Sequence, residues 1–393
     1  MPGPLQGLKI LDFTTLLPGP FATMILADMG ADVLRVLSGS YPDMASFLPP
    51  FLPDSDLSCN LAYLGRGKRC LNLNLKMTSA VEIVHRLIKK YDIVIEQFRP
   101  GIMARLGLAY EDLRAVNPSL IYCSLTGYGQ TGPLKNRAGH DINFLARSGL
   151  MSYSGTKDQG PSLTGMQIAD VASGSNNAVI GILAAVIHRK ETGEGQHIDI
   201  SMTDGVMAFN AMMATTYLAG AAQPQRGQEL LNGGSLYDFY ETSDGLYISF
   251  GGLEIQFFAN FCRIIGREDL IPFGIITPNI EQVKKDVREI IRQKTRDQWT
   301  EIFSQVDACV EPVLSLAEAI ADENTRAREM VIEFTLPSGE KLKQIANPIK
   351  FSATKQEYRS IGCLAGTHTR EALLEMGYTE EQICCYEKEG VFD

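Results

Sequence analysis

Residues 8–37, LKILDFTTLLPGPFATMILADMGADVLRVL, decide the fold of this chain. The apolar runs at 8–15 and 31–37 predict two buried strands. The segment between them predicts a helix with Pro20 in its first turn and Gly30 at its end, where proline and glycine are most often found. A strand, a helix and a strand at this spacing form a βαβ unit, so we expect the two strands to pair in parallel.

The alternation of strands and helices continues to about residue 220. Further strands are predicted at 70–75, 92–98, 119–129 and 196–201, with helices at 79–91, from near Asp170 to Gly193, and at 203–218. These elements predict an α/β fold with a doubly wound, mostly parallel open sheet, like a Rossmann fold. Such sheets bind ligands beyond the carboxyl ends of their strands, which is where FRPG (98–101) and GYGQTGP (127–133) fall.

The pattern changes after residue 220. Residues 235–252 predict an antiparallel hairpin around a Ser-Asp-Gly turn, followed by helices at 254–266 and 279–305. We therefore expect three segments: a large ligand-binding α/β domain at 1–220, a smaller α+β domain at 225–335, and a return segment at 340–393 that completes the large domain.

Composition excludes several classes of protein. Of the 393 residues, 21% are charged and the net charge is −10, which argues against nucleic acid or an anionic membrane as the main partner. We find no run of about 20 apolar residues, as a membrane helix requires, and no secretory signal. The eight cysteines show no spacing typical of zinc ligands. We therefore expect a cytoplasmic protein with free thiols and no metal.

Two acidic positions and one histidine are the first candidates for chemistry. AGHDINFLARSG (138–149) places His140 beside Asp141 ahead of a predicted helix. Histidine is well suited to move protons near neutral pH, but Asp141 could simply cap the helix, with His140 incidental. Asp170 precedes VASGS and is either a plain N-cap or a carboxylate that a helix N-terminus keeps ionised as a base or nucleophile.

Two further features are candidates for a functional site. Glu254, in FGGLEIQFF, is either a functional acid in apolar surroundings or the first-turn glutamate of an amphipathic helix. The basic cluster GRGKR (65–69), with Arg99, could bind phosphate, although it matches neither GxxxxGK[ST] nor GxGxxG and could equally be a solvated turn. Lys135 and Arg137, close to His140 in sequence, also favour an anionic ligand.

Several motifs taken together resemble the class III CoA-transferase superfamily, also called the CaiB/BaiF or carnitine dehydratase family. They are, in order, LPGPFATMILADMGADVLRV, GRGKRCLNLNLK, FRPGIMARLGL, SLTGYGQTGP, AGHDINFLARSG, IADVASG and TGEGQHIDISM, so the similarity covers nearly the whole chain. Within the superfamily, GHDIN, residues 225–258 and VDACVEPVL (306–314) resemble the α-methylacyl-CoA racemase branch. That branch inverts the α-carbon of 2-methylacyl-CoA thioesters.

The resemblance implies a role for each candidate. His140 and Asp170 would be the two catalytic bases, Glu254 would orient the histidine, reaching it from the other subunit, and Asp141 would support Asp170. The expected CoA-binding residues are Leu73, Asn74, Leu75, Lys76, Gly139, Ile142, Asn143 and Phe144, with Lys68, Arg69 and Arg99 as basic groups. The resemblance also implies an interlocked homodimer that needs no cofactor beyond the coenzyme A of its substrate.

The sequence departs from the racemase pattern after the second predicted strand. Ser38 stands where racemases carry an arginine for the CoA phosphates, and the proline-rich stretch 37–63 predicts a longer surface loop than theirs. Two alternatives therefore remain open. The protein could be a CoA-transferase in which Asp170 attacks the thioester and forms a mixed anhydride, leaving His140 without a necessary role. It could also be an acyl-CoA-binding homologue without activity.

Overall fold

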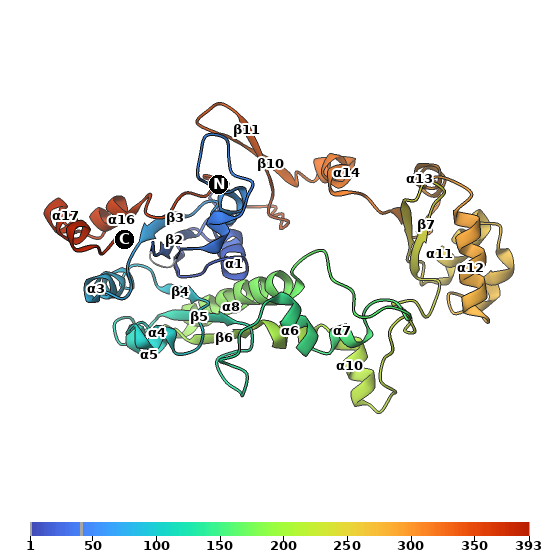
Figure 1. Cartoon of the computed structure of the whole chain (residues 1–393), viewed down its shortest axis with the longest axis horizontal. Helices are drawn as coiled ribbons and strands as arrows, with labels where there is room; N and C mark the ends of the chain where they lie inside the picture. The colour runs from blue at the N-terminus through green and yellow to red at the C-terminus, as the bar shows by residue number, and fades with distance from the viewer. Residues whose placement is uncertain (1, 40–41, 393) are drawn as a thin grey trace. The chain divides into compact units, whose positions relative to one another are not determined.

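The computed structural model describes residues 2–39 and 42–392. The chain forms two compact units (Figure 1). The first contains Met1–Ser148, Thr164–Phe209 and Glu329–Asp393, and the second contains Gly149–Leu163 and Asn210–Arg328. The second unit thus begins earlier than the expected residue 225, ends before 335, and takes in a segment between Gly149 and Leu163 that sequence patterns left in the large domain.

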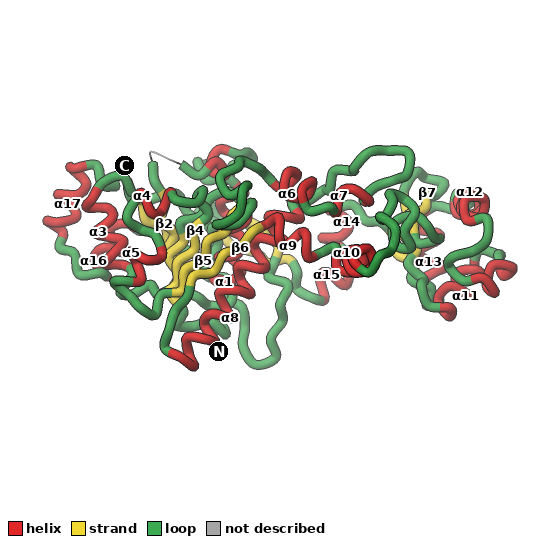
Figure 2. The backbone as a smooth tube through the Cα atoms, turned by 90° about the horizontal axis from the view of Figure 1, so that it is seen from below, coloured by secondary structure: helices red, strands yellow, loops and turns green. Residues whose placement is uncertain are grey.

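A six-stranded parallel sheet forms the centre of the first unit (Figure 2). Its strands are β1 Lys9–Asp12, β2 Asp32–Leu37, β3 Arg69–Asn72, β4 Ile93–Glu96, β5 Ile121–Thr126 and β6 His197–Ser201. Their order is β3-β2-β1-β4-β5-β6, and every neighbouring pair is parallel. The expected doubly wound parallel sheet is confirmed, and the strand order reverses its direction between β1 and β4.

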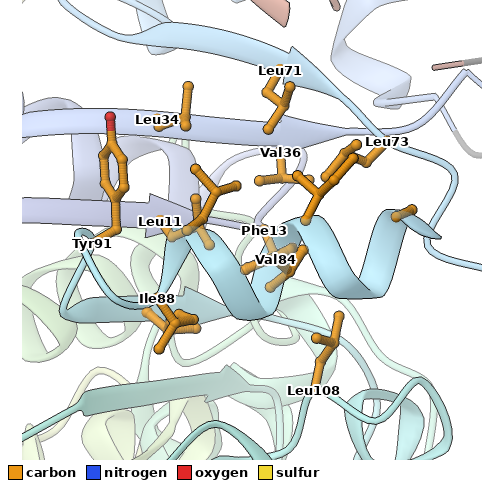
Figure 3. Packing of buried hydrophobic residues seen from close by; sticks show 14 of the residues in the cluster. Leu11, Phe13, Leu34, Val36, Leu71, Leu73, Val84, Ile88, Tyr91 and Leu108 are labelled. Atoms are coloured by element: carbon orange, nitrogen blue, oxygen red, sulfur yellow. The ribbon is translucent and has the colours of Figure 1, made fainter. Parts of the chain in front are cut away.

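Helices cover both faces of this sheet. Leu11, Leu34 and Val94 point into a buried cluster with α3 (Thr78–Leu87), shown in Figure 3, whereas the adjacent Ile10 and Val33 face the other side, as strand alternation requires. The cluster also includes side chains of α5 (Tyr110–Arg114), α16 (Thr369–Glu375) and α17 (Glu380–Glu389). The opposite face packs against α1 (Pro18–Asp28) and α8 (Asn176–Thr192).

The helix expected from Asp170 to Gly193 begins two residues earlier and has an irregular first part. Ile168–Ser175 (η2) is a π-helix, and the regular helix α8 follows and ends at Gly193, which has a φ of 77°. The Ser175 hydroxyl donates to the carbonyl oxygens of Asp170 and Pro18 within this stretch. Such π-helical insertions are often found at functional sites.

The same helix corrects an expectation about hydropathy. Ile168–Thr192 is long and apolar enough to pass as a membrane span, with a mean hydropathy of 1.4, whereas we expected no such segment. The test uses only length and composition, so a helix in the core of a globular domain can pass it as well. Here 44% of the most apolar 18-residue stretch of the helix is buried inside the structure, and the helix packs against α1 and β5. We therefore interpret it as a helix that covers one face of the sheet.

The remaining elements of the first unit lie around the sheet. They are η1 Met44–Phe47, α2 Cys59–Leu64, α4 Ile102–Arg105, α6 Asp141–Arg147, α9 Met202–Ala208 and the hairpin β10 Val331–Thr335 with β11 Lys341–Ile345. The stretch 37–63, expected as a loop, therefore contains two short helices, and its residues 40–41 lie outside the described part of the chain. Asp43 fixes it through a buried ion pair with Arg35 of β2.

The second unit is built on the antiparallel sheet β7-β8-β9. The expected hairpin is confirmed as β7 Asp238–Glu241 and β8 Tyr247–Phe250, with Gly245 in the turn at a φ of 74°, and β9 is Val310–Pro312. The helices are α7 Leu150–Tyr153, α10 Ala211–Leu218, α11 Ile255–Ile264, η3 Glu268–Phe273, α12 Ile280–Ile291, α13 Arg296–Phe303, α14 Leu316–Ala321 and α15 Glu323–Ala327. The helices expected at 203–218 and 279–305 are each broken in two, the latter where Thr295 caps α13.

Candidate active site

A cavity of about 430 Å³ lies in the first unit, at the carboxyl ends of the strands where the sheet reverses. Its wall includes Leu16 and Pro18 after β1, residues 97–100 after β4, and residues 126–128 at the end of β5. β1 and β4 are neighbours at the switch point of the strand order, where open α/β sheets bind their ligands. Residues 98–100 of FRPG and 127–128 of GYGQTGP thus line a cavity at the edge where the sequence predicts ligand binding, and the ligand site itself stays a prediction.

His140 and Asp170 line this cavity together. His140 is the N-cap of α6 and is exposed, and Asp170 lies in the π-helix η2 and is half-buried. The two come from segments 30 residues apart, which the contact between α6 and η2 joins. The structure therefore brings a basic imidazole and a carboxylate to one ligand-sized space.

Asp141 does not cap its own helix, which corrects the simpler of the two interpretations. His140 occupies the N-cap, and Asp141 is the first helical residue. Its Oδ1 instead accepts hydrogen bonds from the backbone N–H groups of Ala169, at 2.6 Å, and Asp170, at 3.0 Å. Because these donors open η2, the Asp141 carboxylate anchors the segment that carries Asp170.

Burial and the negative charge of Asp141 together raise the pKa of Asp170 to about 6, although the charge of His140 partly opposes them. An aspartate ordinarily titrates near 3.9 and a histidine near 6.5. The basicity of this carboxylate is therefore close to that of an ordinary imidazole. A carboxyl group with a raised pKa in a cavity is a common mark of acid–base sites.

Two glycines make room for the aromatic wall of the cavity. A Cβ on Gly127 would lie 2.2 Å from the ring of Phe144, and one on Gly139 would lie 2.7 Å from it. Phe144 also packs edge-on against Tyr128, with ring centroids 5.2 Å apart. Of the expected CoA contacts in this segment, Gly139, Asn143 and Phe144 line the cavity, whereas Ile142 is not part of its wall and is 54% exposed.

Three exposed cations lie on the cavity wall: Arg99, Lys135 and Arg137. The structure assigns the other expected cations to internal ion pairs. Lys68 is buried and lies 3.4 Å from Asp12, and Arg69 bonds Asp32, Glu371 and Glu375. The cluster GRGKR is therefore mainly a structural feature here, while Arg99 and the two cations near His140 face the ligand space.

The segment 73–76 does not line the cavity either. Leu73 is fully buried in the cluster of Figure 3, packed there with the partly buried Leu75, and the backbone N–H of Asn74 donates to the carbonyl of Val391. Lys76 is exposed. Glu254 belongs to the second unit, where it is the exposed N-cap of α11. The roles that the resemblance implies for these residues stay predictions.

Sequence reasoning missed several residues of the cavity, among them Leu16, Gln97 and Thr126. Glu96, at the end of β4, also shapes it: its Oε2 accepts from the N–H of Phe98 at 2.8 Å, and burial raises its pKa to about 7. Leu16 has a φ of 61° and its N–H donates to Asp43 at 2.9 Å. A search of the carboxyl-terminal residues of each predicted parallel strand would have found Gln97 and Thr126.

The structure defines an α/β protein with a cavity, lined by three cations, at the switch point of its parallel sheet. The chain belongs to CoA-transferase family III, whose model matches residues 5–369. Its structure is similar to that of a CaiB/BaiF family protein from Brucella suis, with a TM-score of 0.84 and 30% identity, covering 96% of this chain and all of that one.

Proteins of both activities known in this family are similar to the chain. Human α-methylacyl-CoA racemase is 34% identical, covering 96% of this chain and 95% of its own length. The succinate–glutarate CoA-transferase of Agrobacterium fabrum is also 34% identical, covering 95% of this chain and 96% of its own. Overall identity therefore places the chain in the superfamily without separating isomerase from transferase.

Proposed function

We propose that this protein is an acyl-CoA racemase that inverts the α-carbon of a 2-methylacyl-CoA thioester. The observation that carries the proposal is that His140 and Asp170 line one cavity, with the pKa of Asp170 raised to about 6. A transferase needs only the carboxylate. A racemase needs two bases of comparable strength, because each must be able to act as the acid in one direction of the reaction.

The chemistry follows from the weak acidity of the carbon beside a thioester carbonyl. In one direction the imidazole of His140 removes the α-proton while the protonated carboxyl of Asp170 delivers a proton to the other face. In the reverse direction the carboxylate of Asp170 is the base and the imidazolium is the acid. The shift in the pKa of Asp170 serves this exchange, since it keeps a measurable fraction of the carboxyl protonated near neutral pH.

Arg99, Lys135 and Arg137 support a CoA thioester as the substrate. They place three positive charges on the wall of a cavity in a protein whose net charge is −10. Coenzyme A carries phosphate groups, which arginine binds by paired hydrogen bonds. Because Ser38 replaces the family arginine, we propose that these three side chains supply the charge that this position lacks. Leu73–Lys76, Lys68 and Arg69 would then act on CoA only indirectly.

We also propose that the working form is a homodimer in which Glu254 orients His140. The resemblance implies this role, and Glu254 is exposed on its own unit. Large apolar side chains on the first unit support a second copy: Ile180 and Ile187 of α8 are 62% and 64% exposed. Sedimentation of the purified protein and of an Ile180→Asp, Ile187→Asp variant tests this, with a dimer expected for the former and a monomer for the latter.

The main competing function is a class III CoA-transferase. The similarity to the Agrobacterium fabrum transferase favours it, and Asp170 is placed where it could attack a thioester carbonyl. A homologue that binds acyl-CoA without turnover is a third possibility, which the coexistence of His140, Asp141 and Asp170 in one site disfavours.

One experiment separates the three functions. The protein is incubated with a 2-methylacyl-CoA in heavy water, with and without a free carboxylic acid as acceptor. Deuterium at the α-carbon without an acceptor identifies the racemase, and transfer of CoA to the acid identifies the transferase. Binding with neither reaction identifies the inactive homologue and overturns the proposal, as does transfer without exchange.

Variants of the two bases sharpen this result. His140→Ala is expected to abolish deuterium exchange, whereas a transferase would keep most of its activity. Asp170→Asn is expected to disable either reaction. The matched control is His85→Asn, because the ring of His85 bonds the carbonyl of Gly107 and is not part of the cavity wall. It should leave the exchange rate unchanged.

A further inference from the structure

Two cysteines far apart in sequence meet beside a histidine, outside the cavity. Cys70 lies in β3 and is 1% exposed, whereas Cys363 lies ahead of α16 and is half-buried. The Cys70 thiol donates a long hydrogen bond, 3.9 Å, to the backbone carbonyl oxygen of Cys363. The two cysteines therefore lie side by side although 293 residues separate them in sequence.

His368 completes the cluster. Its Nδ1 lies 3.7 Å from the sulfur of Cys363 and 3.2 Å from the backbone nitrogen of Cys70, which donates to it. Since a donor already points at Nδ1, this nitrogen carries the lone pair and the proton resides on Nε2. The backbone N–H of His368 in turn donates to the carbonyl of Cys70. The ring is thus held with an acceptor facing the Cys363 thiol.

The charges around the cluster favour the thiolate on Cys363. The hydrogen bond from Cys70 lowers the pKa of Cys363, and the hydroxyl of Thr367 and the positive charge of Arg35 lower it further. The pKa of Cys70 is raised, first by its hydrogen bond to Cys363 and then by burial. Burial also raises the pKa of Cys123, Cys262 and Cys309, so the pKa of Cys363 shifts in the opposite direction from these other thiols of the chain.

We propose that Cys363 and Cys70 form an oxidation site, in which Cys363 reacts with a peroxide and Cys70 resolves the product. The Cys363 thiolate attacks one peroxide oxygen, the O–O bond breaks, and the departing hydroxide takes a proton to become water. Cys363 is then a sulfenic acid. The Cys70 sulfur displaces its hydroxyl group, which leaves as water with the Cys70 proton, and a disulfide forms. Two thiols and one peroxide thus give one disulfide and two waters.

This inference is independent of the activity proposed above. The geometry supports it because the Cys70 sulfur lies 3.9 Å from the backbone of Cys363 and both cysteines contact Nδ1 of His368. The partial exposure of Cys363 admits a small oxidant, while the burial of Cys70 keeps it for the second step. In a reducing compartment such a bond would be transient, as expected of a redox-sensing pair.

The first test compares alkylation rates at pH 7. Purified full-length protein is treated with iodoacetamide, and each cysteine is followed by peptide mass spectrometry. Exposure alone predicts that Cys309 and Cys385 react first, because both are exposed. The proposal predicts that Cys363 reacts before Cys309 and Cys385, since a lowered pKa raises the thiolate fraction and the thiolate is the reactive form. A slower Cys363 overturns the proposal.

The second test uses hydrogen peroxide as the probe. One equivalent is expected to produce a peptide pair linked through Cys70 and Cys363, reversed by dithiothreitol. In Cys70→Ser the linked pair disappears and a sulfenic acid on Cys363 is trapped by dimedone. His368→Asn is expected to slow the reaction several-fold, whereas His85→Asn leaves it unchanged. Oxidation of Cys309 or Cys385 before any link between Cys70 and Cys363 overturns the assignment, and circular dichroism of each variant separates this from misfolding.

Discussion

The Oδ1 atom of Asp141 accepts a hydrogen bond from the backbone N–H of Asp170 at 3.0 Å. This bond joins the start of α6, which presents His140, to the π-helix that presents Asp170. The same carboxylate also raises the pKa of Asp170. One side chain therefore sets both the position of the second base and part of its basicity.

Asp141→Asn is expected to lower the pKa of Asp170. The amide oxygen keeps an acceptor for the N–H groups of Ala169 and Asp170, but the negative charge that raises the pKa is lost. Protonation of Asp170 limits deuterium exchange at low pH, so the exchange rate of the unmodified protein should fall as the pH drops through about 6. In Asp141→Asn this fall should occur at a lower pH. Deuterium exchange measured from pH 4.5 to 8 tests this, and a fall at the same pH in both proteins would contradict it.

Asp170→Asn is expected to stabilise the protein while it abolishes activity. The folded-state pKa of about 6 exceeds the usual value, so folding is opposed wherever the unfolded chain is ionised. The full shift corresponds to about 3 kcal/mol at pH 7, and partial exposure reduces this to about 1–2 kcal/mol. Urea unfolding should show this gain at pH 7 and a shrinking gain as the pH falls towards 4. A destabilised variant at pH 7 would refute the expectation.

Glu96→Gln is expected to stabilise the protein above pH 7 and to change little at pH 5. Burial raises the pKa of Glu96 to about 7, so its stabilising protonated form is lost as the pH rises through that value. The amide oxygen of glutamine can still accept from Phe98, which keeps the loop after β4 in place. Thermal unfolding at pH 5 and pH 8.5 checks this. Equal effects at both pH values would show that ionisation of Glu96 is not the cause.

Gly127→Ala is expected to displace Phe144 and to distort the cavity. The added Cβ would lie 2.2 Å from the Phe144 ring, a contact that requires the ring to move and costs about 1–3 kcal/mol. Phe144→Val in the same chain should restore part of the stability, because it removes the clashing atoms. Gly160→Ala is the control, since its Cβ would meet nothing within 4 Å. If Phe144→Val did not restore stability, the destabilisation by Gly127→Ala would not come from the clash with Phe144.

Arg137→Gln is expected to weaken binding of free coenzyme A by about 1 kcal/mol, roughly fivefold in Kd. Arg137 lines the cavity and is exposed, so it can contact a phosphate. Titration calorimetry at two salt concentrations should show a smaller salt dependence for the variant. Arg69→Gln offers the comparison: its guanidinium is engaged by Asp32, Glu371 and Glu375, so CoA affinity should hardly change. If Arg69→Gln weakened CoA binding more than Arg137→Gln did, the phosphate-binding site would instead lie at GRGKR.

Local sequence patterns determined the sheet and the place of its ligand site. Apolar runs separated by capped helices specify parallel strands, and the carboxyl ends of such strands meet at one edge. Residues 98–100 and 127–128 could therefore be assigned to a candidate ligand site from the sequence, and they line the cavity. His140 and Asp170 could be chosen as residue types, because an imidazole and a carboxylate near helix starts suit proton transfer.

Only the tertiary structure decided which polar groups meet. Asp141 resembles a helix cap in the sequence, yet its carboxylate bonds a backbone 28 and 29 residues away. Lys68 and Arg137 are both basic residues in the sequence, but Lys68 is buried against Asp12 whereas Arg137 lines the cavity. Cys70 and Cys363 meet across 293 residues. Periodicity reports how a segment lies against its neighbours, whereas ion pairs, basicity and thiol contacts depend on three-dimensional distances that no local pattern encodes.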